Sequence, residues 1–279
     1  MHLLKKITIY GFLATSALMF FGCSLTLNSC GRSNPPEDPS QNQTPTPSDK
    51  HYDGLEKVIL PSDLVEQIKD YTGFTVSFNK NNHTPNYVAW ELLASEVSNN
   101  VSRSDNFWQD PEIIGCPAHS DYSYSGYDRG HMCPAADQKW SEKAMNDCFV
   151  MANMCPQDNQ LNAGAWLTLE NKERDWAKRD SAIVIIAGPI YKETDTKRIG
   201  NIGVRVPSAY FKALLAPYVD KPRAIAFVYP NMTAPGNMQD YAMSIDDLEK
   251  LLGYDFFSSL PDEIENKVEA TYSFTEWNR

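Results

Sequence analysis

The chain has 279 residues, 42% hydrophobic and 11% aromatic, so it can bury a core and is not intrinsically disordered. Its net charge of −11 argues at first against a polyanionic partner, because phosphates prefer a basic surface. The acidity is uneven, however: residues 231–279 hold ten acids and three bases, a net of −7, which leaves −4 for residues 1–230. A locally positive cleft is therefore compatible with the sequence.

The N-terminus has the pattern of an export signal. A basic pair precedes the apolar run 7–22, and small residues and a cysteine follow it. The letters LNSC, ending at Cys30, resemble a bacterial lipobox better than the FFGC that ends at Cys23. We expect residues 1–30 to be a signal peptide of the lipoprotein type, which places the protein in the cell envelope, on its periplasmic or surface face. A plain secretory signal or a single membrane anchor is the alternative.

Residues 31–55 are rich in Pro, Ser, Asn, Gln and Asp, which predicts a disordered tether. No second linker or internal repeat follows, so residues 56–279 are expected to form one domain. An exported chain can form disulfides, and four cysteines allow three pairings. Without a CxxC pair, a zinc site is poorly supported. These cysteines are Cys116, Cys133, Cys148 and Cys155.

Hydrophobic patterning predicts more strands than helices, in mixed order, and hence an α+β fold. The expected strands are 74–79, 87–93, 149–154, 182–191, 203–207, 210–216 and 223–230. The continuous apolar run 182–191 should be the central strand. The expected helices are 141–148, capped by Ser141, the amphipathic segment 161–180, and 244–253, capped by Ser244 and ended by Gly253.

The tetrapeptide DRGH at 128–131 contains a candidate catalytic histidine. His119 and His131 are the two plausible catalytic imidazoles among five histidines. Neutral imidazole suits a general base, Arg129 offers a charged fork for phosphate oxygens, and Gly130 allows close backbone approach. Taken alone, however, such a tetrapeptide is more often a salt-bridged turn than a site.

A second polar cluster runs from an expected strand into the amphipathic helix. A hard cation such as Mg²⁺ takes oxygen ligands and keeps several waters, so one amide oxygen and one nearby carboxylate can suffice. The alternative is that these side chains only cap the helix and complete the turn. The cluster comprises Asn153, Gln157, Asn159, Asn162 and Glu170.

Together the two segments resemble a family. DRGHMCPAAD (128–137) followed by MANMCPQDNQLNAGAWLTLE (151–170) closely resembles the DNA/RNA non-specific endonucleases of the ββα-metal type. The similarity extends over about residues 56–270. It implies a central antiparallel sheet flanked by helices, with a ββα-metal active-site motif. It also implies cleavage of DNA and RNA substrates to leave 5′-phosphates.

The resemblance assigns roles to the polar residues. His131 would be the general base that deprotonates the attacking water, and Asn162 would be the one direct protein ligand of Mg²⁺. Arg129 and Arg103 would bind phosphate and stabilise the transition state. Mn²⁺ would fit the same oxygen-rich site. Because a single carboxylate accompanies this block, a two-metal cluster is not expected.

Asn153 would position His131 or the phosphate, and Glu170 would order metal-bound waters. On a regular helix Glu170 lies about 12 Å and about 80° from Asn162, so it should act through water rather than as a direct ligand. Trp166 is expected to pack in the core. Asp128 could bind metal, but a salt bridge or hydrogen bond that fixes the following backbone is the favoured reading.

Cys133 and Cys155 depart from the family pattern, and each precedes a proline near a candidate catalytic residue. If the two strands pair, a Cys133–Cys155 disulfide and a second Cys116–Cys148 bridge are expected. Two other functions remain as alternatives: a catalytically inactive surface lipoprotein that captures nucleic acid, and a cysteine hydrolase that uses Cys133 or Cys155.

Overall fold

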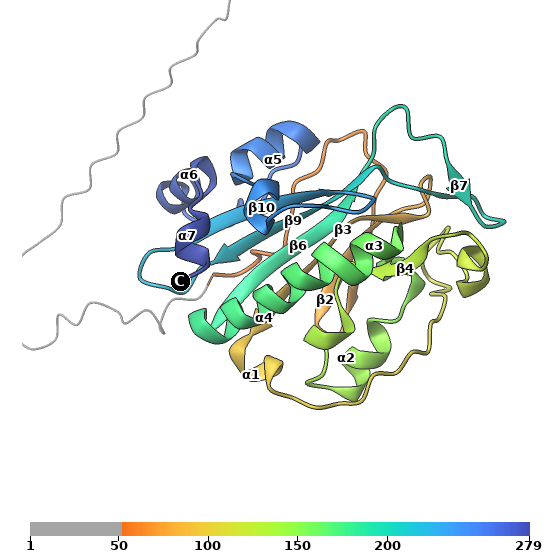
Figure 1. Ribbon diagram of the computed structural model, residues 1–279, viewed down its shortest axis with the longest axis horizontal. Helices are drawn as coiled ribbons and strands as arrows, with labels where there is room; N and C mark the ends of the chain where they lie inside the picture. The colour runs from red at the N-terminus through yellow and green to blue at the C-terminus, as the bar shows by residue number, and fades with distance from the viewer. Residues whose placement is uncertain (1–51) are drawn as a thin grey trace, which may run out of the picture. The chain divides into compact units, whose positions relative to one another are not determined.

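The computed structural model describes residues 52–279 (Figure 1). Its centre is a seven-stranded sheet in the order β1-β2-β3-β6-β9-β10-β11, and every neighbouring pair is antiparallel. The strands are β1 (Gln67–Tyr71), β2 (Phe74–Asn79), β3 (Thr84–Leu93), β6 (Ala182–Ile190), β9 (Ala209–Ala216), β10 (Arg223–Pro230) and β11 (Ala242–Met243). The predicted α+β class with a central antiparallel sheet is confirmed.

Strand β6 occupies the middle of the sheet, as its apolar run predicts. All nine of its residues are buried, and successive side chains point to opposite faces. Ile183 and Ile185 join the core on one face, whereas Val184 and Ile186 join a separate core on the other. A strand covered on both faces reads as continuously hydrophobic rather than alternating.

Helices cover both faces of the sheet (Figure 1). The long helix α4 packs Leu169 and Trp176 into the first core, and α5 packs Ile245 and Leu248 into the second. The helices are α1 (Ala94–Val97), α2 (Glu142–Asp147), α3 (Asn159–Leu161), α4 (Leu167–Asp180), α5 (Ile245–Leu252), α6 (Asp262–Ala270) and α7 (Phe274–Trp277). The DRGH motif lies on the α4 side, and α5 and α6 of the acidic C-terminal segment lie on the other, whereas Trp277 of α7 belongs to the first core.

Predicted helix ends are confirmed where a capping residue marks them. The Ser141 hydroxyl accepts a hydrogen bond from Ala144 N at the start of α2. The Ser244 hydroxyl accepts from Asp247 N at the start of α5, and Gly253 ends that helix in the left-handed conformation. These caps satisfy backbone groups that the helix itself leaves free.

Two predicted strands are wrong in part. Residues 149–154 do not form a strand: Met151–Asn153 make a 3₁₀ turn, and strand β5 begins only at Met154. The segment 203–207 contributes only the two-residue strand β8 (Val204–Arg205), paired with β7 (Arg198–Ile199) outside the main sheet. In both places apolar residues are buried without belonging to the main sheet, and hydrophobicity alone does not distinguish such segments from sheet strands.

The packed chain begins slightly before the expected domain start at residue 56. Leu55 is only 1% exposed and belongs to the second core, although the tether was expected to reach this residue. The predicted signal peptide and nearly all of the predicted tether lie outside the described residues. Within residues 52–279, no helix has the length and apolar character needed to cross a membrane.

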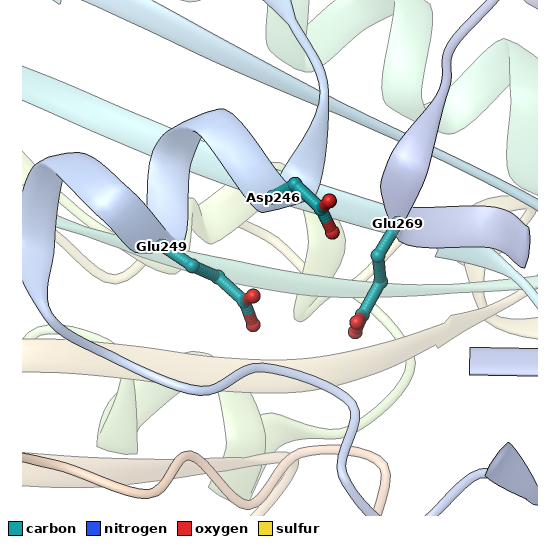
Figure 2. Close-up of side chains that lie close together, drawn as sticks. All are labelled: Asp246, Glu249 and Glu269. Atoms are coloured by element: carbon teal, nitrogen blue, oxygen red, sulfur yellow. The ribbon is translucent and has the colours of Figure 1, made fainter. Parts of the chain in front are cut away.

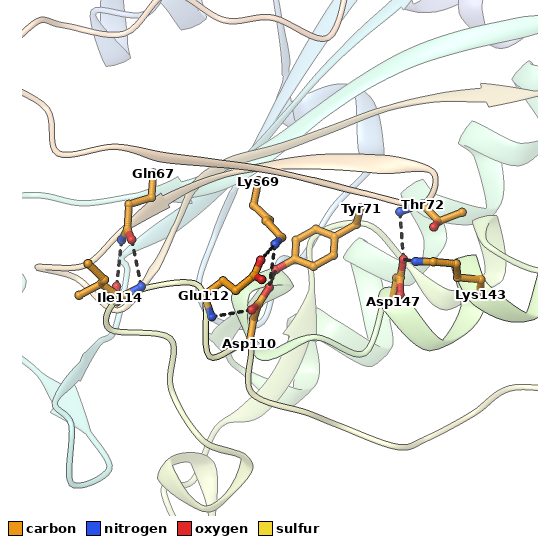
Figure 3. Close-up of polar contacts among 9 residues, drawn as sticks. All are labelled: Gln67, Lys69, Tyr71, Thr72, Asp110, Glu112, Ile114, Lys143 and Asp147. Carbon is orange, nitrogen blue, oxygen red and sulfur yellow. Dashed lines mark hydrogen bonds and ion pairs between the residues drawn. The ribbon is translucent and has the colours of Figure 1, made fainter.

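The segment that precedes the DRGH motif is fastened to the edge strand β1 (Figure 3). Tyr71 Oη donates to Asp110 Oδ2 at 2.6 Å, and the Gln67 amide exchanges two hydrogen bonds with the Ile114 backbone, each of 2.9 Å. At the end of β1, Thr72 N donates to Asp147 Oδ2 of α2 at 3.0 Å. These contacts fix the loop on which Arg103 and Phe107 approach the motif.

Candidate active site

The DRGH residues form strand β4 (Asp128–His131), which pairs antiparallel with β5 (Met154–Gln157). Helical residues 159–180 follow directly, so two strands and a helix from one stretch of sequence make a ββα unit. Gly130 is required at its position for steric reasons. A Cβ added there would lie 2.3 Å from Gln157 Oε1 and 2.6 Å from Gln157 Cβ, so only glycine lets Gln157 pack across the strand.

A cavity of about 270 Å³ opens beside this unit. Five of the six residues predicted for the site line it together: Arg103, Arg129, His131, Asn162 and Glu170. Arg103 comes from a loop that precedes the motif by more than twenty residues, and Glu170 comes from α4. The sequence prediction therefore named groups that the fold brings together, including one that is remote from the motif.

His131 is held between aromatic rings. Phe149 meets its ring edge-on at 4.9 Å between centroids, and Phe107 lies 5.8 Å away. Burial, followed by the positive charge of Arg103, lowers the pKa of His131 to about 3, against opposing contributions from Asp105 and the Arg129 backbone. Its Nε2 is buried and has no hydrogen-bond partner among the described residues. The imidazole is therefore neutral, with one nitrogen available to a ligand.

Each of the two arginines stacks on one of the aromatic rings that contact His131. The Arg129 guanidinium carbon lies 4.9 Å from the centroid of Phe107, and that of Arg103 lies 4.9 Å from the centroid of Phe149. Arg129 Nε is buried and unpartnered in the described part of the chain, whereas Arg103 Nε donates to Asp105 Oδ1 at 2.5 Å. Stacking fixes the planes of both forks and leaves donors for an anion.

Asp128 orients the candidate metal ligand. Its Oδ2 accepts hydrogen bonds from Asn162 Nδ2 at 2.9 Å and from Asn159 Nδ2 at 3.0 Å. Because the amide nitrogen of Asn162 is engaged, its Oδ1 is the atom left for another partner, and no donor among residues 52–279 binds it. The favoured expectation for Asp128, a local hydrogen bond, fits this placement, but the bond fixes Asn162 rather than the Arg129 backbone.

The helix that carries Asn162 is not regular. Residues Asn162–Trp166 form a π-helical segment between α3 and α4, and Gly164 departs from helical geometry with φ −109° and ψ −109°. The residues between Asn162 and Glu170 therefore do not follow a regular helix, and both residues line the same cavity. Such π segments occur often at functional sites. Trp166 is 0% exposed and packs in the core, as predicted.

Glu170 lies near a network of buried ion pairs. Lys212 of β9 is fully buried and bonds Glu173 at 2.7 Å, and Arg174 bonds the buried Asp137 at 2.8 Å. Burial raises the pKa of Glu170 to about 7; Lys212 opposes the rise, and the nearby carboxylates add to it. Among the described residues Glu170 makes no hydrogen bond or ion pair. Glu170 is thus a carboxyl group at the cavity whose ionised form would be stabilised by a bound cation.

Asn153 does not line the cavity. It is completely buried, and its amide is saturated by Cys133 N and Cys133 O at 2.9 Å each and by Cys148 O at 2.8 Å. This arrangement supports a role in positioning the strand that carries His131. It leaves no hydrogen-bonding capacity in the Asn153 amide for a phosphate.

The predicted disulfides are absent, and all four cysteines of the described chain are free and buried. In the β4–β5 register Cys155 faces Gly130, so Cys133 lies three residues further along and cannot be its cross-strand partner. Cys148 Sγ donates to Met145 O at 3.1 Å instead of meeting Cys116. Burial raises every thiol pKa, to about 11 for Cys116 and about 12 for Cys148, so the cysteine-hydrolase alternative has no nucleophile here.

Comparison with known proteins identifies the family of this chain. The profile of the DNA/RNA non-specific endonuclease family matches residues 51–263. The chain belongs to that family. Among its relatives in the family, the mitochondrial nuclease EXOG of Danio rerio is 34% identical over 209 residues, covering 68% of this chain and 60% of the relative. A nuclease of Nostoc sp. is 33% identical over 221 residues, covering 71% and 75% respectively.

A solved structure of the same fold extends the likeness to three dimensions. A chain in the crystal structure of the EndoG/EndoGI complex superposes with a TM-score of 0.66 at 28% identity, covering 71% of this chain and 89% of that chain. The match confirms the predicted fold. The chain spans 60% of the length of the zebrafish relative.

Several residues of the site were not predicted. Phe107 and Phe149 form the aromatic platform, and Lys212 neutralises the charge beneath Glu170. A lysine within the apolar strand 209–216 is a signal that was available, because a buried lysine requires an acidic partner. The phenylalanines offered no such signal, since their chain neighbours do not reveal which rings face an arginine.

Proposed function

We propose that this chain is a metal-dependent endonuclease that hydrolyses DNA and RNA without sequence preference and leaves 5′-phosphates. One observation carries the proposal: His131 Nε2, Arg129 Nε and Asn162 Oδ1 belong to residues that surround one cavity, and none has a protein partner in the described chain. The His131 and Arg129 atoms are also buried, and buried polar atoms without partners mark places where a ligand completes the hydrogen bonding.

The chemistry follows from these groups. Neutral His131 would accept a proton from a water as the water oxygen attacks phosphorus and the bond to the 3′-oxygen breaks. A base with a pKa near 3 is weak, but an anionic phosphate entering the cavity raises that pKa because negative charge favours the imidazolium. Arg129 and Arg103 would hold the non-bridging oxygens and stabilise the charge that develops on them.

The donor set fits a divalent hard cation. Asn162 would hold it through Oδ1 and Glu170 would bind its water ligands, because amide and carboxylate oxygens are the ligands that Mg²⁺ and Mn²⁺ prefer. A bound ion would supply charge neutralisation at the phosphate. The Asn162 amide is already fixed by Asp128, so the site needs little rearrangement to bind an ion.

Recognition through phosphate explains the lack of base preference. The charged groups that line the cavity, Arg103, Arg129 and Glu170, suit an anion and a cation rather than base edges. We also propose that the enzyme is exported and tethered by a lipid at its N-terminus, for which the pattern of residues 1–30 is the support. Metabolic labelling with a fatty acid tests this, and an unlabelled wild-type chain would refute the anchor.

A plasmid-nicking assay tests the activity. Cleavage should require Mg²⁺ or Mn²⁺, stop with EDTA and be abolished in His131→Ala, which should still bind DNA. His119→Ala is the matched control: His119 also lies near Phe107, at 5.5 Å between ring centroids, but it does not line the cavity. It should retain most of the activity. Binding without cleavage by wild type would instead indicate an inactive capture protein, and products ending in 3′-phosphate would contradict the proposed bond cleavage.

A further inference from the structure

Three carboxylates meet on the face of the sheet opposite the nuclease cavity. Asp246 and Glu249 lie one helical turn apart on α5, and Glu269 lies in the last turn of α6. One oxygen from each lies within 4.8 Å of the others, and the three side chains point toward one another (Figure 2). This cluster belongs to the acidic C-terminal segment, to which the nuclease reaction assigns no role.

For two of the three carboxylates, the local structure explains why a negative charge is tolerated. Asp246 lies in the first turn of α5, where a negative charge is favourable, and Glu249 Oε1 accepts a hydrogen bond from Phe256 N at 2.8 Å. Glu269 has neither advantage. It lies near the C-terminus of α6, where the helix dipole disfavours an anion, and it is only 6% exposed. Its Oε1 is buried without a hydrogen-bond partner in the described chain.

The charges around Glu269 increase the cost of ionising it. Burial, followed by repulsion from neighbouring carboxylates, raises the pKa of Glu269 to about 9; these acids are Glu249, Glu265, Asp255 and Asp246. The nearest basic residue on α5, Lys250, pairs instead with Asp247 at 3.3 Å. A buried carboxylate among acids requires either a proton or a cation.

The number of carboxylates favours one cation over another. Ca²⁺ takes about six to eight oxygen ligands in a flexible geometry and accepts several carboxylates. Mg²⁺ keeps several of its waters and is usually bound through one or two carboxylates. Three carboxylates whose oxygens lie within 4.8 Å of one another therefore suit Ca²⁺ better than Mg²⁺.

We propose that Asp246, Glu249 and Glu269 form a calcium site that clamps α5 to α6, separate from the metal of the nuclease reaction. Calcium would give the buried Glu269 oxygen its missing partner. It would also neutralise the repulsion among carboxylates drawn from two helices. The ion would thus stabilise the C-terminal part of the domain rather than take part in hydrolysis.

The test is calcium titration of the full chain by calorimetry in an Asn162→Ala background, which removes the direct ligand at the nuclease cavity. One ion should bind, with a Kd on the order of 0.1–1 mM as in extracellular calcium modules, and should raise the Tm. Mg²⁺ should bind at least about tenfold more weakly. Failure of Ca²⁺ to bind, or equal affinity for Mg²⁺, would overturn the assignment.

Glu269→Gln keeps the shape of the side chain and removes its charge, so it should abolish the calcium-dependent rise in Tm. Glu263→Gln, on the exposed first turn of the same helix, is the matched control and should bind like the parent. If Glu269→Gln does not fold, Asp246→Asn serves the same purpose. Undiminished calcium affinity in the cluster variants would show that the ion binds elsewhere and would overturn the assignment. Nuclease activity of Glu269→Gln with Asn162 intact should match wild type, so this result is independent of the proposed reaction.

Discussion

Replacing Asp128 with alanine removes the acceptor shared by two asparagine amides. The bonds to Asn162 and Asn159 measure 2.9 and 3.0 Å, and each hydrogen bond to a charged acceptor contributes about 1.5–3 kcal/mol. Only the first of them orients the atom that would bind metal. Loss of the hydrogen bond that orients Asn162 therefore corresponds to about a 10- to 100-fold weaker affinity for the ion.

The assay is plasmid nicking as a function of Mg²⁺ concentration. Asp128→Ala should shift the half-activating concentration upward by about 10- to 100-fold and recover much of its rate at high Mg²⁺. Asn159→Ala removes only the second hydrogen bond and is the matched control, with a shift of less than about threefold expected. A variant Asp128→Ala with unchanged Mg²⁺ dependence and a lower maximal rate would refute the positioning argument.

Three further outcomes are expected. In the metal-free protein, the free energy of unfolding of Glu170→Gln should gain about 3 kcal/mol over that of the wild type when the pH is raised from 4 to 8. The pKa of Glu170 in the folded protein, about 7, exceeds the ordinary 4.5, so the wild type loses stability as the pH rises between these values. The same difference between the two proteins at both pH values in urea denaturation would contradict this. Gly130→Ala should lower the free energy of unfolding by about 1–3 kcal/mol. Adding Gln157→Ala should restore only part of that stability, because the Cβ of residue 157 stays 2.6 Å from the new methyl group. Full restoration, measured by urea denaturation of the single and double variants, would show that only the Gln157 amide clashes. Under native conditions the four buried thiols should resist iodoacetamide, whereas mass mapping after unfolding without reductant should find each one modified; a Cys133–Cys155 linked peptide would disprove the free-thiol assignment.

Sequence patterns predicted those parts of the fold that local chemistry specifies. The run 182–191 contains too much apolar surface to lie anywhere but the sheet centre, and Ser244 and Gly253 mark the two ends of α5. The cavity residues followed from the family resemblance rather than from local patterning. His131 and Asn162 could be named because their motif spacing fixes them on adjacent elements of one ββα unit.

The errors came from contacts between distant segments. The turn at Met151–Asn153 replaces a strand because the Asn153 amide supplies hydrogen bonds to the backbone of Cys133 and Cys148. Cysteine counting could not reveal the strand register, and the register decides against a Cys133–Cys155 bridge. The predicted helix 161–180 is also interrupted at Gly164, and hydrophobic periodicity contains no marker of such an irregularity.

The attachment of the arginine-bearing loop to β1 sets an upper working temperature for the enzyme. Because β1 is at the edge of the sheet, it opens at a lower free-energy cost than the central strands. When it opens, the contacts of Tyr71 and Gln67 with the loop are lost, and Arg103 and Phe107 lose their support. Warming should therefore inactivate the protein reversibly several degrees before its circular dichroism changes, and amide exchange should be faster in β1 than in the central strands β3 and β6.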